Sequence, residues 1–404
     1  MKKQIYLIYA IVLVDMTAGS IIWPVLPQIV EDAPYPQLIL ALGTALFLGV
    51  QIFTAPLLGK LSDIHGRKPI FLLSAIGTFF ANALLLFKTP LSFLANRTAD
   101  GLTNGVYGVV KSSITDASTE DDLAKNMGLE GSVISIGFIL GPLFSGGLIL
   151  LLNLEGEAAI RPLILLSLLL SALNILLAFL FKETLTFKKQ TSLSVKEVIK
   201  DELSLSKAIP SLKNLYHTNR IAFNVMLIQV FLTMSLGYYH YFITFIGLGE
   251  LKMNAKEISQ FFIYMGFINI VINYVFYTRF VDKINPMKFI PVVAVFGIIT
   301  HIGYAFVGSS QMALYIVLTL DCLTVSLLPG LVDVLLSEQT EQDNRGEIFG
   351  YSQLFTSFAN ILTTSVFGLL SLISINFPFF WFAICLVPLI FVRRLLATGT
   401  NNYR

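Results

Sequence analysis

Long apolar stretches separated by short polar connections run along the entire chain. Runs of about 20 apolar residues, the length at which a helix crosses the hydrocarbon core of a bilayer, recur from one end to the other. Backbone groups in lipid must be hydrogen-bonded within their own segment, so each run is predicted to be a helix. The pattern therefore predicts an all-α integral membrane protein with twelve transmembrane helices. We place these spans roughly at 4–30, 37–58, 69–88, 91–113, 125–152, 160–182, 220–247, 257–280, 287–308, 311–335, 347–373 and 376–397.

One long polar segment, rich in Lys, Ser and Glu, separates the first six spans from the last six. Charged residues repeat around it: Asp63 and Asp282 each follow an even-numbered span, and Lys125 and Arg345 each precede an odd-numbered one. This repetition of charged positions predicts two pseudo-symmetric six-helix halves, an architecture typical of transporters. The expected domains are an N-terminal six-helix bundle at 1–182, a cytoplasmic linker with a possible interfacial helix at 183–219, and a C-terminal six-helix bundle at 220–404.

Composition and charge agree with a membrane protein and give it an orientation. The 404 residues are 55% hydrophobic and 13% charged, with a mean hydropathy of +0.77, whereas soluble proteins carry about 25% charged residues. Lys and Arg are concentrated in the connections on one side of the predicted spans. By the positive-inside rule, this asymmetry places both termini in the cytoplasm.

The residues typical of enzymes and metal sites are sparse. Cys322 and Cys385 are isolated within apolar runs, so neither a disulfide framework nor a metal site is expected. The chain has no G-x-x-x-x-G-K-[ST] pattern of an ATP site. We therefore expect no enzymatic activity, no cofactor and no metal, and infer that any transport is driven by an ion gradient or by the substrate's own gradient.

A charged turn at 59–70 lies between the second and third spans. Its residues Gly59-Lys60-Leu61-Ser62-Asp63-Ile64-His65-Gly66-Arg67-Lys68 match the pattern G-x-L-x-D-x-x-G-R-K without a gap. This pattern resembles the signature loop between helices 2 and 3 of the major facilitator superfamily. The resemblance implies that Gly59, Asp63, Gly66 and Arg67 form a latch between conformations. The alternative is a polar turn whose basic residues mark the cytoplasmic side.

Three acidic residues, Asp15, Asp100 and Asp321, fall near the middle of predicted spans. An ionisable side chain at that depth is costly, and it therefore indicates a function. Arg97 precedes Asp100 by three positions, so the two side chains share a helix face. We expect Asp15, Arg97, Asp100 and Asp321 to carry proton coupling. The alternative for each acid is neutralisation by a neighbouring helix for packing alone.

Asp15 and Asp100 lie in segments that resemble more specific motifs of the major facilitator superfamily. Asp15 is followed by Ile22-Trp23-Pro24-Val25-Leu26-Pro27, and an acid before I-x-P-V-L-P resembles the drug/proton antiporters of the tetracycline-efflux kind. The segment Leu94-x-x-Arg97-x-x-Asp100-Gly101 resembles the helix-4 motif of the superfamily, in which the Arg is implicated in proton transfer. An acid replaces the usual amide at position 100, which favours an ion pair between Arg97 and Asp100.

The fifth span contains a glycine-rich pattern around a proline. Gly137, Gly141, Pro142 and Gly146 resemble the helix-5 antiporter motif g-x-x-x-G-P-x-x-G-G, with Ser145 in place of the first Gly of the closing pair. Small residues let another helix approach closely, and the proline removes one backbone hydrogen bond. The resemblance implies a tight helix contact and favours export over import. Gly and Pro are also common in membrane helices without such a role.

Further polar residues within the spans are candidates to line a substrate cavity. Each of them is alternatively a hydrogen-bonding contact between helices. His240 and His301 fall towards the outer ends of their spans. Either imidazole could titrate near neutral pH, but an interfacial, hydrogen-bonded His is expected. The cavity candidates are Asn104, Tyr107, Gln229, Asn269, Asn273 and Asn360.

These observations predict a secondary active transporter that exports a small amphiphilic molecule or drug by alternating access, coupled to protons. The alternatives are a proton-coupled or facilitative importer of a nutrient or siderophore, a lipid transporter of the same fold, and a receptor that does not transport. We expect the partners to be the substrate, protons and the lipid bilayer, with no nucleic acid. We further expect a monomer in the cell inner membrane.

Overall fold

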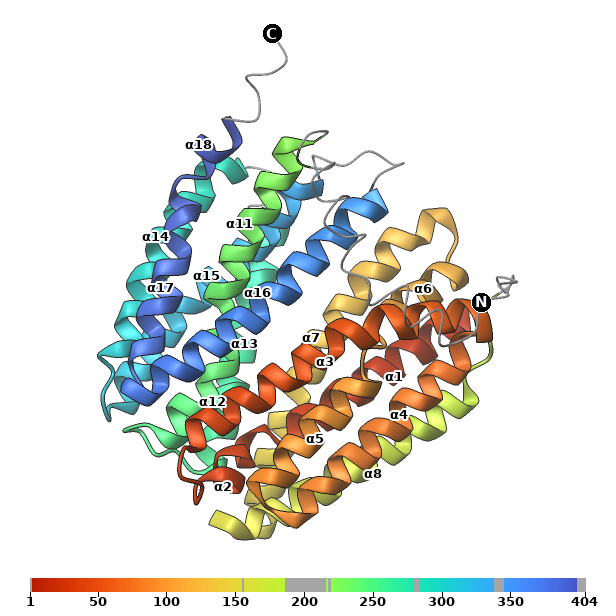
Figure 1. The fold of residues 1–404 in the computed structure, drawn as a ribbon, viewed down its shortest axis with the longest axis horizontal. Helices are drawn as coiled ribbons and strands as arrows, with labels where there is room; N and C mark the ends of the chain where they lie inside the picture. Colours follow the sequence, from red (N-terminus) through yellow and green to blue (C-terminus); the bar gives the residue numbers. More distant parts are fainter. Residues whose placement is uncertain are drawn as a thin grey trace. The chain divides into compact units, whose positions relative to one another are not determined.

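The computed structural model describes residues 2–154, 156–185, 216, 219–279, 284–337 and 345–397. Within these ranges the chain forms helices and no strand (Figure 1). The helices in chain order are α1 (Lys2–Ile21), η1 (Trp23–Val25), α2 (Leu26–Val30), α3 (Pro36–His65), α4 (Arg67–Leu84), η2 (Leu85–Phe87), α5 (Pro90–Thr103), α6 (Tyr107–Ala117), α7 (Glu120–Leu152), η3 (Gly156–Ala159), α8 (Ile160–Leu180), α11 (Arg220–Leu236), α12 (Tyr238–Leu248), α13 (Ala255–Arg279), α14 (Pro286–Ala305), α15 (Gln311–Ser337), α16 (Arg345–Ile373), α17 (Phe377–Ile390) and α18 (Val392–Ala397).

Ten helical segments in the described part of the chain are long and apolar enough to cross a membrane. They coincide with ten of the twelve predicted spans. The other two differ from the prediction: the fourth is divided into α5 and α6, and the twelfth consists of the 14-residue α17 followed by α18. That these two segments also cross the membrane stays a prediction.

The fourth predicted span is interrupted at Asn104–Val106 by contacts with α3. A Cβ atom on Gly105 would lie 2.7 Å from the backbone N of Ala55, so the two backbones approach closely here. The side-chain amide of Gln51 also donates a hydrogen bond to the Asn104 carbonyl at 2.8 Å. Satisfying a freed backbone carbonyl by a neighbouring helix is what permits such a break at membrane depth.

The chain divides into two compact units, Met1–Ser204 with Met253–Ile263, and Leu205–Lys252 with Tyr264–Arg404. In the first unit α1 packs against α7 and α8, α3 packs against α5, and α4 packs against α5 and α8. The apolar core around α1 includes Ile8, Val12, Phe71 and Val109, all buried. The predicted linker at 183–219 lies largely outside the described residues.

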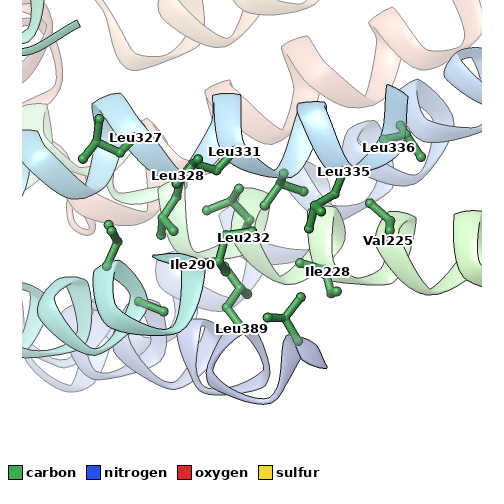
Figure 2. Packing of buried hydrophobic residues seen from close by; sticks show 14 of the residues in the cluster. Val225, Ile228, Leu232, Ile290, Leu327, Leu328, Leu331, Leu335, Leu336 and Leu389 are labelled. Atoms are coloured by element: carbon green, nitrogen blue, oxygen red, sulfur yellow. The ribbon is translucent and has the colours of Figure 1, made fainter. Parts of the chain in front are cut away.

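In the second unit α11 packs against α15, α16 and α17, and α14 packs against α15 and α17. Figure 2 shows the apolar core where α11, α14, α15 and α17 meet, with Leu232, Ile290, Leu331 and Leu389 at its centre. Lipid chains are as apolar as these side chains, so close van der Waals packing, rather than exclusion of water, holds such helices together.

The helix contacts repeat between the two units. As α1 packs against α7 and α8 in the first unit, α11 packs against α16 and α17 in the second. As α4 packs against α5 and α8, α14 packs against α15 and α17. The fold therefore consists of two pseudo-symmetric helical halves, as the sequence predicted.

Candidate functional site

Asp15 on α1 lies at the junction of three helices of the first unit. Its side chain is 8% exposed. Its Oδ1 accepts a hydrogen bond from the Asn174 amide of α8 at 3.2 Å, and its Oδ2 accepts one from the Tyr107 hydroxyl of α6 at 3.4 Å. A small cavity beside the carboxyl is lined by these three side chains, Ser74 and apolar residues. Asp15 is therefore a buried acid with polar partners and room next to it.

Asp100 on α5 is the second buried acid of this unit, at 7% exposed. Its Oδ1 accepts a hydrogen bond from the Thr78 hydroxyl of α4 at 3.0 Å. The Asn104 side chain interacts with both carboxyls, and the two carboxyls interact electrostatically with each other. Asp15, Asn104 and Asp100 thus form one connected group within the first unit.

Two amide oxygens beside these acids have no hydrogen-bond donor. Asn104 Oδ1 and Asn174 Oδ1 are both buried and without a partner. A buried acceptor without a donor is costly, by about 1–3 kcal/mol. A protonated carboxyl has an O–H to donate, whereas an ionised one only accepts. Asn104 and Asn174, which contact these acids, therefore each keep an amide oxygen that is able to accept from a protonated carboxyl.

Arg97 differs from its prediction. Its Nε donates to the Asn96 Oδ1 at 2.7 Å, and its guanidinium lies over the rings of Phe47 and Phe93, with centroid distances of 5.7 and 6.0 Å. The structure thus corrects the predicted pair with Asp100: each side chain has other partners, and the two interact only through their charges. The spacing of Arg97 and Asp100 places both on one helix face. The rings of Phe47 on α3 and Phe93, one turn earlier on α5, instead determine where the guanidinium lies.

Asp321 on α15 is the buried acid of the second unit, at 1% exposed. Its Oδ2 accepts hydrogen bonds from the hydroxyls of Tyr238 and Tyr304 at 2.5 and 3.3 Å, and its Oδ1 accepts one from Thr300 at 2.7 Å. His301 lies beside it, with 3.6 Å between His301 Nε2 and Asp321 Oδ1. His301 is fully buried and lies near the C-terminal end of α14. That this end of the helix lies at the outer membrane interface stays a prediction.

The two units place an acid and a threonine in equivalent positions. Thr78 on α4 donates to Asp100 on α5, and their residue numbers differ by 22. Thr300 on α14 donates to Asp321 on α15, and their residue numbers differ by 21. Because α14 and α15 occupy the places that α4 and α5 have in the first unit, the hydroxyl-to-carboxyl hydrogen bond is repeated in both halves.

Three of the four predicted cavity residues of the second unit form hydrogen bonds between helices in the described part of the chain. Gln229 on α11 donates to Asp333 Oδ1 at 2.9 Å and accepts from Ser352 at 2.6 Å. Asn269 and Asn273 on α13 both contact the Ser326 hydroxyl of α15, at 2.9 and 3.4 Å. Asn360 is half-buried on α16. Whether these side chains also line a substrate path stays a prediction.

The signature turn between α3 and α4 is built around Arg67. Its Nη1 donates to Ser62 Oγ at 2.6 Å and pairs with Asp63 at 2.5 Å, and its Nε donates to Asp116 of α6 at 3.0 Å. Arg67 is 6% exposed, whereas Asp63 is 34% exposed. A planar guanidinium can hold several such partners at once. Asp116 is a partner that the motif did not reveal.

A second carboxylate stabilises the start of α4. Glu183, which follows α8, accepts hydrogen bonds from the backbone N–H groups of Arg67 at 2.9 Å and Lys68 at 3.2 Å. These groups have no partner within the helix, and a negative charge at a helix N-terminus is favourable. Gly66 leaves room for this contact because it has no Cβ atom, which would lie 2.8 Å from Glu183 Cδ. Its φ of 108° and ψ of 163° also lie in a backbone region that favours glycine. A Cβ atom on Gly59, by contrast, would meet nothing within 4 Å.

The glycine pattern of α7 allows close contact with α1. A Cβ on Gly137 would lie 2.5 Å from Met16 Cβ, and one on Gly141 would lie 2.8 Å from the backbone N of Ile21. Ser145 donates to the Ile21 carbonyl at 2.6 Å. Pro142 lies within α7, which continues to Leu152. A Cβ on Gly146 would lie 3.2 Å from Ser259 Cβ of α13, so this position also faces a neighbour.

Several residues that contact the buried acids or Arg67 could not be identified as functional candidates from the sequence. Thr78, Asn174, Asp116 and Thr300 are ordinary polar residues whose partners lie on other helices, and hydroxyls and amides are frequent in membrane spans. Glu130 on α7 is a further buried acid, at 4% exposed, at the beginning of its apolar segment.

In the described part of the chain, no three His, Cys, Asp or Glu side chains gather in a group that could hold a metal ion.

Comparison with known proteins agrees with this fold. The family model of the Major Facilitator Superfamily matches residues 8–364, and the chain therefore belongs to this superfamily of membrane transporters. It is a multi-pass membrane transporter and not an enzyme. The human organic anion transporter has a similar fold, with a TM-score of 0.68 and 17% identity, covering 97% of this chain and 99% of that one.

Two relatives are drug resistance proteins by name. The class H tetracycline resistance protein of Pasteurella multocida is 33% identical over 189 residues, which are 46% of each chain. The chain thus spans about half the length of this relative. The multidrug resistance protein 2 of Bacillus subtilis is 24% identical over 385 residues, covering 94% of this chain and 91% of that one.

Proposed function

We propose that this transporter exports a small amphiphilic molecule or drug in exchange for protons, by alternating access. The observation that carries the proposal is the group of Asp15, Asn104 and Asp100 within the helices of the first unit. Two buried carboxyls lie here with hydroxyl and amide donors that stabilise the ionised form and with amide oxygens that would accept from the protonated form. Both protonation states therefore have partners, as a proton carrier requires.

The relatives support export as the direction. The tetracycline and multidrug resistance proteins are similar to this chain, the first over about half of its length and the second over most of it. The close contact of α7 with α1 at Gly137 and Gly141 agrees with the antiporter motif that the sequence resembles. An importer of a nutrient or siderophore and a lipid transporter are the alternatives that the experiment below separates.

We further propose how the signature turn takes part in the cycle. With both termini in the cytoplasm, the Gly66 turn faces the cytoplasm, and Asp63 and Arg67 act there as a conformational latch. Arg67 is held by Ser62, Asp63 and Asp116, so it is already ordered for that role. Asp63 is partly exposed and therefore accessible to a second partner during the cycle. The proposal also places the protein, as a monomer, in the cell inner membrane.

The test is proton exchange by the purified protein in liposomes that contain a pH-sensitive dye. Tetracycline is the first probe, followed by other amphiphilic cations and, separately, by a nutrient and a lysolipid. A proton flux opposite to the movement of tetracycline or another drug supports export by antiport. A flux in the same direction as the substrate would establish an importer, and transport of only lysolipid would establish a lipid transporter.

Asp15→Asn is the variant that tests whether the group of Asp15, Asn104 and Asp100 carries the proton. It removes the carboxyl group but keeps a side chain of similar size. The single amide oxygen still accepts from Asn174, and its NH2 group can donate to the Tyr107 hydroxyl. We expect the substrate-dependent proton flux to be lost while the protein folds and binds substrate. The matched control is Asp32→Asn, which removes an exposed acid beyond the end of α2. A proton flux that is unchanged in Asp15→Asn would contradict the assignment of Asp15.

A further inference from the structure

His301 and Asp321 lie in a buried polar cluster of the second unit that the coupling proposal above uses only through the acid. Four helices supply its members. The hydroxyl of Ser235 on α11 lies 3.4 Å from His301 Nδ1, and the Tyr238 ring of α12 packs edge-on against the imidazole, with centroids 4.5 Å apart. His301 and Asp321 are 0% and 1% exposed, so no solvent reaches the pair in this conformation.

Hydrogen-bond accounting assigns the protons of the imidazole. The Ser235 hydroxyl donates to the Phe382 carbonyl at 2.9 Å, so its oxygen is left to accept a hydrogen from His301 Nδ1. In a neutral ring with its hydrogen on Nδ1, the other nitrogen has a lone pair and no hydrogen. That nitrogen, Nε2, has no hydrogen-bond partner and faces Asp321 Oδ1 at 3.6 Å. A lone pair and a carboxylate oxygen thus face each other with room for a proton between them.

The donors around Asp321 decide where such a proton resides. Tyr238 and Tyr304 donate to one carboxylate oxygen and Thr300 donates to the other. Both carboxylate oxygens therefore already accept hydrogen bonds, whereas His301 Nε2 has no hydrogen-bond partner. The added proton therefore belongs on His301 Nε2, where it also completes a charge-assisted hydrogen bond to Asp321.

We infer that His301 and Asp321 form a second proton-binding site, in which a proton from water binds His301 Nε2 and is later released to water. The pair has a charge of −1 without the proton and 0 with it. This inference rests on the proposed proton coupling and names a site for the proton in the second half. Because the pair is sealed here, the proton enters and leaves in another conformation of the cycle.

The other titratable groups that face the pair are Tyr238 and Tyr239 of α12, Tyr304 of α14 and Cys322 of α15. Phenols and thiols ordinarily keep their protons at neutral pH, whereas an imidazole ordinarily titrates at a pH of about 6.5. Among these side chains, the imidazole of His301 is therefore the one that ordinarily titrates nearest to neutral pH. In the first unit, the residue that follows Thr78 is Phe79, so the imidazole distinguishes the second acid from Asp100.

The direct test is nuclear magnetic resonance of the full-length protein labelled with 15N-histidine in lipid nanodiscs. His301→Gln identifies the His301 signals by their loss. We expect these signals to change from a neutral to a protonated imidazole as the pH falls from about 8 to about 4. In Asp321→Asn this change should be lost or displaced, because the carboxylate no longer stabilises the cation. The control is His240→Gln, which removes an exposed imidazole on α12.

Tyr238→Phe keeps the packing of the aromatic cluster and removes one donor to Asp321. It provides a second variant should Asp321→Asn fail to fold, and it should displace the His301 titration. The inference is overturned if His301 stays in one protonation state throughout this pH range. It is also overturned if His301 titrates identically in the wild type, Asp321→Asn and Tyr238→Phe.

Transport measurements separate this inference from the function on which it rests. If tetracycline or another drug drives proton flux in liposomes, His301→Gln should flatten the dependence of the initial rate on pH, whereas His240→Gln should not. An unchanged pH profile in His301→Gln would overturn the coupling role of the pair. If the wild type shows no proton flux with any probe but His301 still titrates with Asp321, the site stands and the proposed export function fails.

Discussion

Gly66 provides a quantitative test of how the signature turn is held. It ends α3 and precedes α4, with a φ of 108° and a ψ of 163°. This backbone region is almost restricted to glycine, and holding another residue there costs about 1–3 kcal/mol. A Cβ at this position would also lie 2.8 Å from Glu183 Cδ and closer still to one carboxylate oxygen. Gly66→Ala therefore introduces backbone strain and displaces the Glu183 carboxylate.

Displacing Glu183 removes the acceptor of the Arg67 and Lys68 backbone N–H groups. Loss of a side-chain cap costs about 1 kcal/mol, so the total destabilisation by Gly66→Ala is about 2–4 kcal/mol. The assay is the thermal midpoint of the purified protein in detergent, followed by its intrinsic fluorescence. For a domain of about 200 residues, each kcal/mol lowers the midpoint by about 2–4 °C.

The matched control is Gly59→Ala in the same motif. Gly59 lies within α3, and a Cβ there meets nothing within 4 Å, so alanine should be neutral or stabilising by up to about 1 kcal/mol. A double-mutant cycle with Glu183→Ala separates strain from the lost cap, because the cost of Gly66→Ala should fall when the carboxylate is absent. The reasoning is refuted if Gly66→Ala is as stable as Gly59→Ala.

Two further predictions concern close packing and the Arg67 cluster. Gly141→Ala should lower stability by about 1–3 kcal/mol, because the added methyl meets the α1 backbone. Gly147→Ala, where a Cβ meets nothing within 4 Å, is its control, and equal midpoints would contradict the close contact. Arg67→Lys should cost about 1–3 kcal/mol, because one ammonium cannot replace the fork that holds Ser62, Asp63 and Asp116. If Arg67→Lys has the wild-type midpoint, the Asp116 contact does not stabilise the fold.

The sequence by itself determined the features that depend on local composition. The number and places of most spans follow from the length of apolar runs, because burying the backbone in lipid requires a helix of that length. Asp15, Asp100 and Asp321 stood out because a charge within such a run is costly wherever its partners lie. The superfamily was recognisable from the turn at 59–70, because its residues are consecutive in sequence.

Only the tertiary structure decided which side chains meet. Asn174 reaches Asp15 across 159 residues of sequence, Asp116 reaches Arg67 across 49, and Glu183 reaches it across 116. An apolar run predicts a helix but leaves open how that helix is rotated about its axis and which neighbour it faces. Helix packing settles this rotation, because glycines such as Gly141 admit one backbone and exclude others. For the same reason, the position of His301 in its span did not reveal that its imidazole lies beside Asp321.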